Sequence, residues 1–199
     1  MKAHRPHINR RQFLQLVAAT GASLPLGQLC AKQSGPETRS ETSPYENLKD
    51  PWLSLAEVQQ HLLPTEKNAP GARDIHALVF LRNMLNAPDS DAEERGFILK
   101  GVDWLNDLSV KNHQQIFRKL SPEKKEKVLR RIETSRAGSR WLSLMMSYLI
   151  EALLSDPVYG GNRDGKGWAW LEHQPGFPSP TADKLYYKLG QPPRRRTKS

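Results

Sequence analysis

The chain contains few of the residues that build covalent cross-links or metal sites. Its 199 residues include one cysteine, Cys30. Haem attachment needs a C-x-x-C-H motif, and a tetrahedral zinc site usually needs several cysteines or histidines, so the sequence offers neither. Cleavage after Ala31 would leave a mature protein without cysteine. Its stability would then have to come from packing or from a partner.

Recognisable catalytic patterns are also missing. The body has four histidines, and none stands three or four positions from another, so no helical metal pair is predicted. No serine lies in a G-x-S-x-G motif. Catalytic groups can assemble from distant positions, so catalysis is not excluded, but no nucleophile has a base at a suggestive spacing.

The run "DPVYGGNRDGKGW", Asp156 to Trp168, fits neither of two well-known glycine-rich ligand loops. A phosphate loop needs Ser or Thr after its lysine, whereas Lys166 is followed by Gly167. A calcium loop needs alternating acidic ligands and a final bidentate Glu, and this run offers little beyond Asp164. The simplest interpretation is a chain reversal in which Asn, Arg and Asp bind backbone groups and the glycines take positive φ angles.

Positive charge is concentrated at the two ends. The net charge is +9, but residues 1–31 and 194–199 hold eight basic residues and no acid. Between 32 and 193, 22 basic residues face 21 acidic ones. Nucleic-acid binding needs a concentrated basic surface, so the balanced body argues against it. We expect 191–199 to form a basic disordered tail.

The N-terminus has the features of an export signal. Arg10 and Arg11 are followed by Phe13 and Leu14, and then by the short apolar stretch 16–26. This stretch is shorter than the roughly 20 apolar residues that span a bilayer, so no stable transmembrane helix is expected after processing. The four residues resemble a bacterial twin-arginine signal, which implies a twin-arginine translocase as partner and a periplasmic location.

The rest of the chain predicts an all-α fold. Residues 32–51 are polar and are expected to form a disordered linker, and 52–190 to form one helical domain. No stretch alternates with the period of a strand, so the expected architecture is an irregular bundle of about five or six helices. A long Gly/Pro-rich loop region follows the bundle.

Capping patterns predict where these helices begin. Ser54 with Glu57, and Ser90 with Glu93, fit capping boxes. Ser121 before Pro122 fits an N-cap followed by proline. Further helices are expected to begin at Asp74 and at Ser139, and the last of these is apolar nearly all round and should be central. The positions expected to be buried on the helices before it are Ile75, Leu78, Val79, Leu81, Leu85, Phe97, Val102, Trp104, Leu105, Leu108, Val128, Leu129 and Ile132.

The glycine-rich run also supports a resemblance. With the later Gly176, Phe177 and Pro178, it is similar to the C-terminal signature of the gluconate 2-dehydrogenase subunit 3 family. The turn "PGARD" (70–74) and the helix start "KLSPEKKEKVL" are similar to family features as well. The resemblance covers about residues 52–182. The spacer before Gly176 is longer and more acidic than the family pattern.

The resemblance implies an accessory role in an oxidoreductase complex. In this family the small subunit does not hold the flavin, and for this chain we expect no catalytic residue, no cofactor-binding residue and no metal site. The small subunit packs against a large GMC-type dehydrogenase subunit that binds FAD, and a cytochrome subunit with haem c often accepts the electrons. The small subunit carries the export signal for both. The residues expected at the partner interface are Tyr159, Asn162, Arg163, Asp164, Trp168, Trp170 and Phe177.

Alternative interpretations stay open. The aromatic residues of the loop could fold back on the helices as a local cap instead of binding a partner. The chain could also be a stand-alone periplasmic helical ligand-binding protein or an enzyme.

The export signal gives a first prediction. Replacing Arg10 and Arg11 with lysine should leave the protein and the activity of its partner in the cytoplasm, because the translocase reads the arginine pair. Cell fractionation with activity measurement tests this. Normal periplasmic activity of the double variant would refute the signal.

Overall fold

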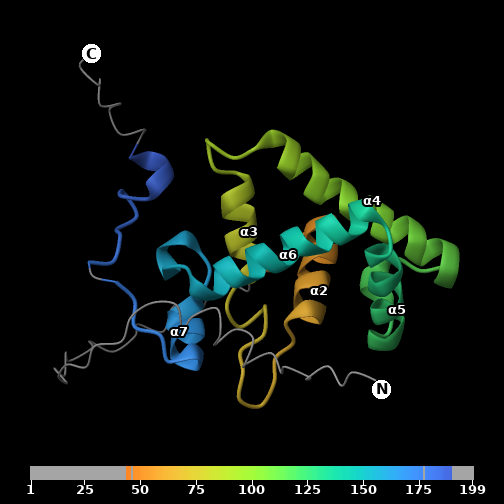
Figure 1. Cartoon of the computed structure of the whole chain (residues 1–199), viewed down its shortest axis with the longest axis horizontal. Helices are drawn as coiled ribbons and strands as arrows, with labels where there is room; N and C mark the ends of the chain where they lie inside the picture. Colours follow the sequence, from red (N-terminus) through yellow and green to blue (C-terminus); the bar gives the residue numbers. More distant parts are fainter. Residues whose placement is uncertain (1–43, 46, 177, 190–199) are drawn as a thin grey trace, which may run out of the picture.

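The computed structural model describes residues 44–45, 47–176 and 178–189, and these form a helical bundle (Figure 1). The α-helices are α2 (Trp52–Leu62), α3 (Ala77–Leu85), α4 (Ala92–His113), α5 (Pro122–Glu133), α6 (Arg136–Leu154) and α7 (Lys166–Leu171). Short 3-10 helices are η1 (Phe117–Lys119), η2 (Pro157–Tyr159), η3 (Arg163–Gly165) and η4 (Tyr186–Lys188). In this part of the chain the only β pairing is an isolated bridge between Glu66 and Ala69. The all-α prediction and its helix number are confirmed.

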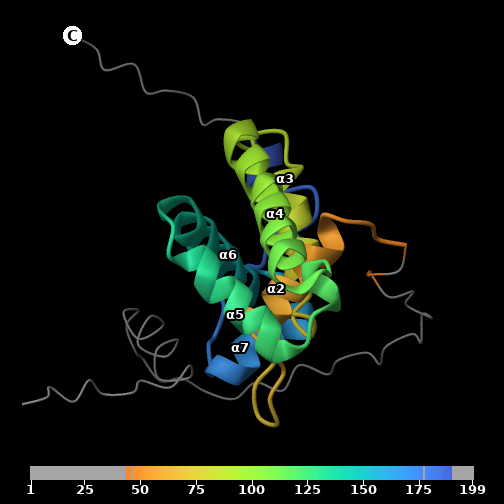
Figure 2. The ribbon, with the colours of Figure 1, turned by 90° about the vertical axis from the view of Figure 1, so that its right-hand side faces the viewer.

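Helix α6 is the centre of the bundle, as predicted. It contacts α2, α3, α4, α5 and α7. Figure 1 shows it running diagonally across the molecule from the α5 end to the α7 end, and Figure 2 looks onto the end formed by α4 and α5. Its first half, with Trp141 and Met145, belongs to a core shared with α2, α3, α4 and α5. Its second half, with Leu149 and Leu153, joins a second core shared with α3 and α7.

The predicted apolar faces are largely correct. Of the positions expected to be buried, Val79, Phe97, Trp104 and Leu108 are half-buried and the rest are buried. The sequence pattern missed Ile98, which is fully buried on α4. Its neighbour Phe97 lies at the edge of the helix interface, where its ring meets that of Trp104 edge-on at 5.6 Å.

The predicted capping boxes are wrong, because neighbouring aspartates compete for the same backbone groups. Ser54 lies inside α2, and Asp50 accepts hydrogen bonds from its backbone N (3.0 Å) and Oγ (2.8 Å). At α4 the N-cap is Asp91, whose carboxylate accepts from Glu93 N at 2.8 Å. Ser90 instead donates to the carbonyl of Leu85.

Two further helices begin at residues other than those predicted. Helix α3 begins at Ala77 and not at Asp74, because His76 adopts a left-handed conformation with φ 55°. Helix α6 begins at Arg136 and not at Ser139, because Ser135 caps it by accepting from Gly138 N at 3.0 Å. The expected start of α5, with Ser121 as N-cap and Pro122 as first helical residue, is confirmed.

The end of the segment expected to be a disordered linker belongs to the folded body. Tyr45 and Leu48 pack against the core around α2 and α4, and the guanidinium of Arg73 lies 5.8 Å from the Tyr45 ring centre. Most of the segment 32–51 for which a linker is predicted lies outside the described residues, so the linker stays a prediction. Residues 1–31 and 191–199 lie outside the described part. Within the described residues, no helix has the length and apolar content needed to cross a bilayer.

The crossing of α4 and α6 depends on a glycine. Trp141 is fully buried, and its indole Nε1 donates to the carbonyl of Ile98 at 2.9 Å. A Cβ atom on Gly101 would lie 2.0 Å from that Nε1. The two helices can approach this closely only because position 101 has no side chain.

Substitution of Gly101 by alanine should therefore destabilise the protein strongly. We expect a loss of about 3 kcal/mol in the free energy of unfolding, because Trp141 cannot move without losing its hydrogen bond and its packing. Gly96→Ala, on the same helix, is the matched control. A Cβ there has no atom within 4 Å, so a gain of up to about 1 kcal/mol is expected. Equal urea unfolding curves for the two variants would contradict this account.

Candidate functional site: the glycine-rich loop and the pocket beside it

The glycine-rich run reverses the chain at the end of α6 and returns it as α7. Asn162 holds the reversal together. Its Nδ2 donates to the carbonyl of Ser155 at 3.0 Å, and its Oδ1 accepts from Gly167 N at 2.7 Å. The side chain is fully buried, so both its donor and its acceptor are used inside the chain.

The glycines serve two different purposes. Gly160 and Gly165 adopt positive φ angles of 94° and 68°, as the sequence predicted. Gly161 and Gly167 instead allow close packing, since a Cβ on Gly167 would lie 2.1 Å from the carbonyl oxygen of Leu153. The left-handed conformation is also adopted by Asn162 and Asp164, which are among the residue types that tolerate it best.

The aromatic residues of the loop fold back on the helices. Trp168 is half-buried, and its Nε1 donates to the carbonyl of Leu154 at 2.7 Å, which satisfies a backbone acceptor at the end of α6. Trp170 and Tyr159 pack against the core shared by α3, α6 and α7. The carbonyl of Tyr159 accepts from Asn83 Nδ2 of α3 at 3.0 Å. The local-cap interpretation thus describes these contacts, although all three aromatic side chains keep part of their surface exposed.

The structure brings together two of the motifs that carry the family resemblance, the glycine-rich loop and the "PGARD" turn. Arg163 of the loop donates through Nη1 to His76 Nε2 at 3.1 Å, and His76 lies two residues after the "PGARD" turn. Arg163 Nε also lies 3.3 Å from the carboxylate of Asp164, whose side chain is 70% exposed. The sequence did not identify His76 as a site residue. Its place two residues after a family motif was the only available signal.

A concave pocket opens where these motifs meet. Its volume is about 510 Å³, and three arginines from different segments line it. Its polar and aromatic lining residues are Tyr45, Glu57, Arg73, His76, Arg118 and Arg163. Of these, Arg163 alone is a site residue that the sequence predicts. The others come from segments that only the tertiary fold brings together.

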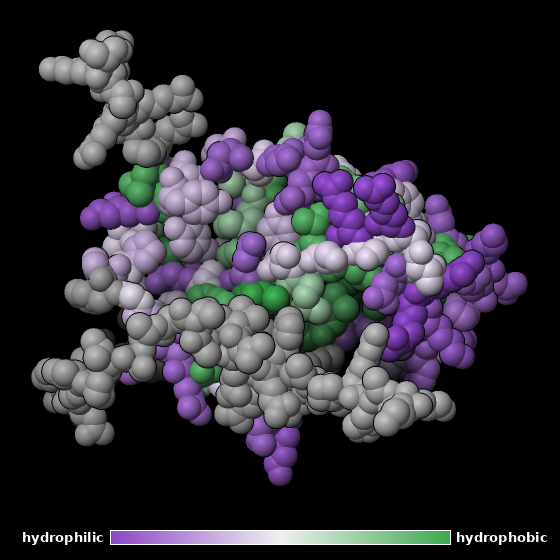
Figure 3. All heavy atoms as spheres, in the orientation of Figure 1, coloured by the Kyte–Doolittle hydropathy of each residue, from purple (hydrophilic) through white to green (hydrophobic). Residues whose placement is uncertain are grey.

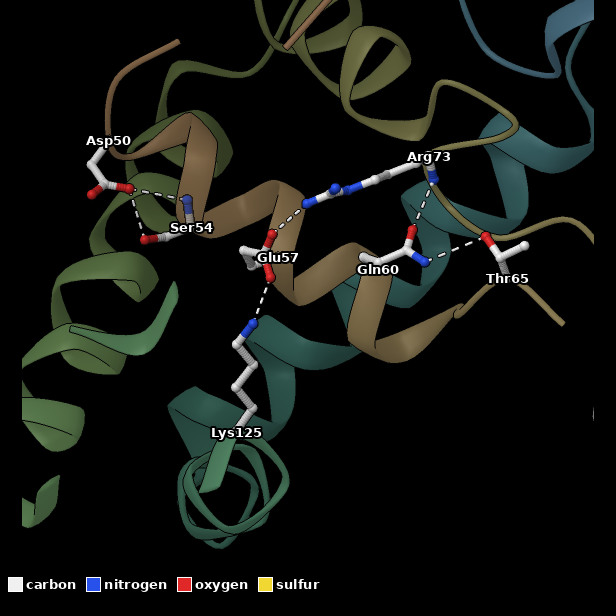
Figure 4. A network of polar contacts seen from close by, with 7 residues as sticks. All are labelled: Asp50, Ser54, Glu57, Gln60, Thr65, Arg73 and Lys125. Carbon is white, nitrogen blue, oxygen red and sulfur yellow. Dashed lines mark hydrogen bonds and ion pairs between the residues drawn. The ribbon is translucent and has the colours of Figure 1, made fainter. Parts of the chain in front are cut away.

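An ion-pair network fixes the wall of this pocket (Figure 4). Glu57 points from α2 toward Arg73 on one side and Lys125 on the other, and Lys125 Nζ lies 2.5 Å from its carboxylate. The backbone N of Arg73 donates to Gln60 Oε1 at 3.1 Å. Both ends of Arg73 are therefore attached to α2, which holds its guanidinium at the pocket.

Asp74 stabilises the "PGARD" turn through its carboxylate. Its carboxylate accepts from Thr65 Oγ1 at 2.6 Å and from Gly71 N at 2.8 Å. Partial burial alone would raise the pKa of Asp74. The hydrogen bonds from Thr65 and Gly71 and the nearby charge of Lys166 outweigh burial, so the pKa of Asp74 is lowered.

The remaining predicted site residues cannot be placed. Arg10, Arg11, Phe13, Leu14 and Phe177 lie outside the described residues. Within the described part of the chain, no group of three or more His, Cys, Asp or Glu side chains is arranged to hold a metal ion.

Comparison with protein families identifies the chain. Residues 49–176 match the family described as gluconate 2-dehydrogenase subunit 3. The chain belongs to this family. The matched region contains both the "PGARD" turn and the glycine-rich loop, so the sequence resemblance is confirmed. Comparison with curated proteins and with solved structures finds no match.

The lowered pKa of Asp74 makes a pH-dependent prediction. The ionised carboxylate stabilises the fold above its unfolded pKa of about 3.9, and this stabilisation is lost as the pH falls through the lower folded pKa. Asp74→Asn should cost about 1 kcal/mol at pH 7, a modest value because the group is partly exposed. The difference in the free energy of unfolding between Asp74→Asn and wild type should become smaller as the pH falls below about 4.

Urea unfolding at several pH values measures this difference. Asp103→Asn is the control, because Asp103 makes only an exposed pair with Lys100 at 3.4 Å, and its effect should be below about 0.5 kcal/mol. A deficit of Asp74→Asn that is the same at pH 7 and pH 3 would show that the carboxylate charge does not stabilise the turn.

Proposed function

We propose that this chain is a non-catalytic small subunit that stabilises a large FAD-binding dehydrogenase subunit and carries it through the twin-arginine export route into the periplasm. Family membership supports the assignment to a dehydrogenase complex. The observation that carries the proposal is the glycine-rich loop. Three hydrogen bonds attach it to α3 and to the end of α6, a fourth closes the loop on itself, and half-buried aromatic rings remain at its surface.

The loop suits a partner interface because it is preorganised. A binding surface that is already ordered loses little conformational entropy on association. Tyr159, Trp168 and Trp170 would supply aromatic anchors, and Arg163 and Asp164 would supply polar contacts. Asn162 is buried, so in this proposal it positions the loop and does not touch the partner.

The flavin would belong to the large subunit, and a third subunit with haem c would accept its electrons. Export of the large subunit would depend on Arg10, Arg11, Phe13 and Leu14 of this chain. The substrate would contact the large subunit.

A second candidate function is a stand-alone ligand-binding protein or enzyme of the periplasm. The pocket of about 510 Å³ between the two family motifs favours it, since this volume lies in the range of small-molecule sites. The two functions differ in what co-purifies with the chain. Purified small subunit that oxidises a sugar or an alcohol without a partner would establish the second.

Affinity purification from periplasm tests the main proposal. The full chain should retain a flavoprotein with dehydrogenase activity. Trp168→Ala should weaken this complex by about 2 kcal/mol, because a half-buried tryptophan at an interface centre is a typical hot spot. The control is Trp104→Ala, a half-buried tryptophan of α4 whose ring meets that of Phe97 edge-on.

The stability of each variant must be measured beside its affinity, since Trp168 also caps α6. Reduced thermal stability with unchanged affinity would assign Trp168 to the local cap alone. A wild-type chain that is recovered as a monomer without flavoprotein would refute the proposed function.

A further inference from the structure

A second concave surface lies on the other side of the loop. It is an apolar groove of about 500 Å³ between α3 and the second half of α6, closed at one end by η4. Its apolar lining residues are Phe80, Met84, Ile150, Leu154, Tyr159 and Tyr186. Tyr186 forms the end wall, with its ring 5.8 Å from that of Tyr159 and its hydroxyl 3.8 Å from Met84 Sδ.

Exposed apolar side chains gather around this groove. The large hydrophobic residues exposed in the described chain are Val110, Met146, Tyr186 and Leu189. Tyr186 and Leu189 belong to the segment that closes the groove, and Met146 lies one turn before Ile150 on the same side of α6. Figure 3 shows hydrophobic atoms visible between hydrophilic ones on one face of the molecule. Clustered apolar exposure of this kind marks interaction surfaces.

One carboxylate lines the groove and two more lie close to its residues. Glu151 lines it from α6, and Glu94 of α4 comes close enough to accept a hydrogen bond from Tyr148, the residue three before Glu151, at 2.6 Å. Burial, and next the charge of Glu94, raise the pKa of Glu151. Burial, and next the charge of Asp89, raise the pKa of Tyr186. No described residue forms an ion pair with any of these three carboxylates. Lys188 of η4 donates to the carbonyl of Ala182.

We propose that this groove binds an apolar segment of the large subunit that carries lysine or arginine on its flanks. The inference rests on the proposed function and extends it, because it names a second contact surface and the chemistry of its ligand. Tyr159 belongs to both the loop and the groove, so the two surfaces form one continuous interface. Cationic flanks would pair with the carboxylates, and apolar side chains would fill the groove.

The charge of the rim argues against two other occupants. In a symmetric dimer of this chain, groove would face groove and the carboxylates of the two copies would oppose each other. A bilayer surface that carries anionic lipid would likewise repel the rim. An apolar partner segment with basic flanks would complement both the apolar lining of the groove and the negative charge of the carboxylates.

Charge and shape variants of the groove test the proposal in the reconstituted complex. Ile150→Arg places a cation in the groove, and Glu151→Lys reverses the rim. Each should raise the Kd for the large subunit at least tenfold, and Glu151→Lys should also reduce the salt dependence of binding. The matched controls are Val110→Arg and Glu133→Lys, at exposed positions of α4 and α5, which should leave the Kd within about twofold.

A second measurement guards against misfolded variants. A photo-crosslinking phenylalanine analogue at position 186, which is 52% exposed, should form an adduct with an apolar peptide of the large subunit flanked by lysine or arginine. Adducts formed only with a second copy of this chain or with lipid, or groove variants that bind as tightly as the controls, would overturn the groove assignment. If wild type retains the flavoprotein in that case, the proposed function still stands; if wild type does not retain it, the function itself fails.

Discussion

The buried amide of Asn162 is the constraint on which the candidate site depends. It joins the end of α6, through Ser155, to the start of α7, through Gly167. Both polar ends of this side chain are satisfied in a place that water does not reach, so only one loop conformation pairs them both. The glycines at 161 and 167 let the returning chain lie directly against the backbone of α6. This arrangement fixes the positions of Arg163, Trp168 and Trp170.

The central helix connects this loop to the rest of the fold. The first half of α6 shares a core with α2, α3, α4 and α5, and its second half shares a second core with α3 and α7. Arg163 meets His76 beside the "PGARD" turn, and Glu57 holds Arg73 of that turn. The two family motifs are therefore parts of one structural unit. Such a unit suits a subunit that supplies shape and transport while a partner supplies redox chemistry.

The sequence predicted the architecture well because helical periodicity is a local signal. The apolar stripe of α5 and the nearly all-round apolar α6 could be identified from spacing alone. Helix starts were predicted less well, since Asp50 and Asp91 compete with Ser54 and Ser90 for the same backbone groups. The pocket could not be predicted, because Glu57, Arg73, Arg118 and Arg163 come together only through tertiary packing. The sequence also does not predict the apolar groove between α3 and α6, because its lining residues come together only through tertiary packing.

The most direct test of the account is the hydrogen exchange rate of the Gly167 amide in the isolated full chain. If Asn162 fixes the loop as described, this amide should exchange within about tenfold of the buried backbone amides of α6, because it opens only with the helix end. Exchange at the rate of an unstructured peptide would show that the loop is not preassembled, and would contradict the claim that this chain presents a rigid surface to its partner.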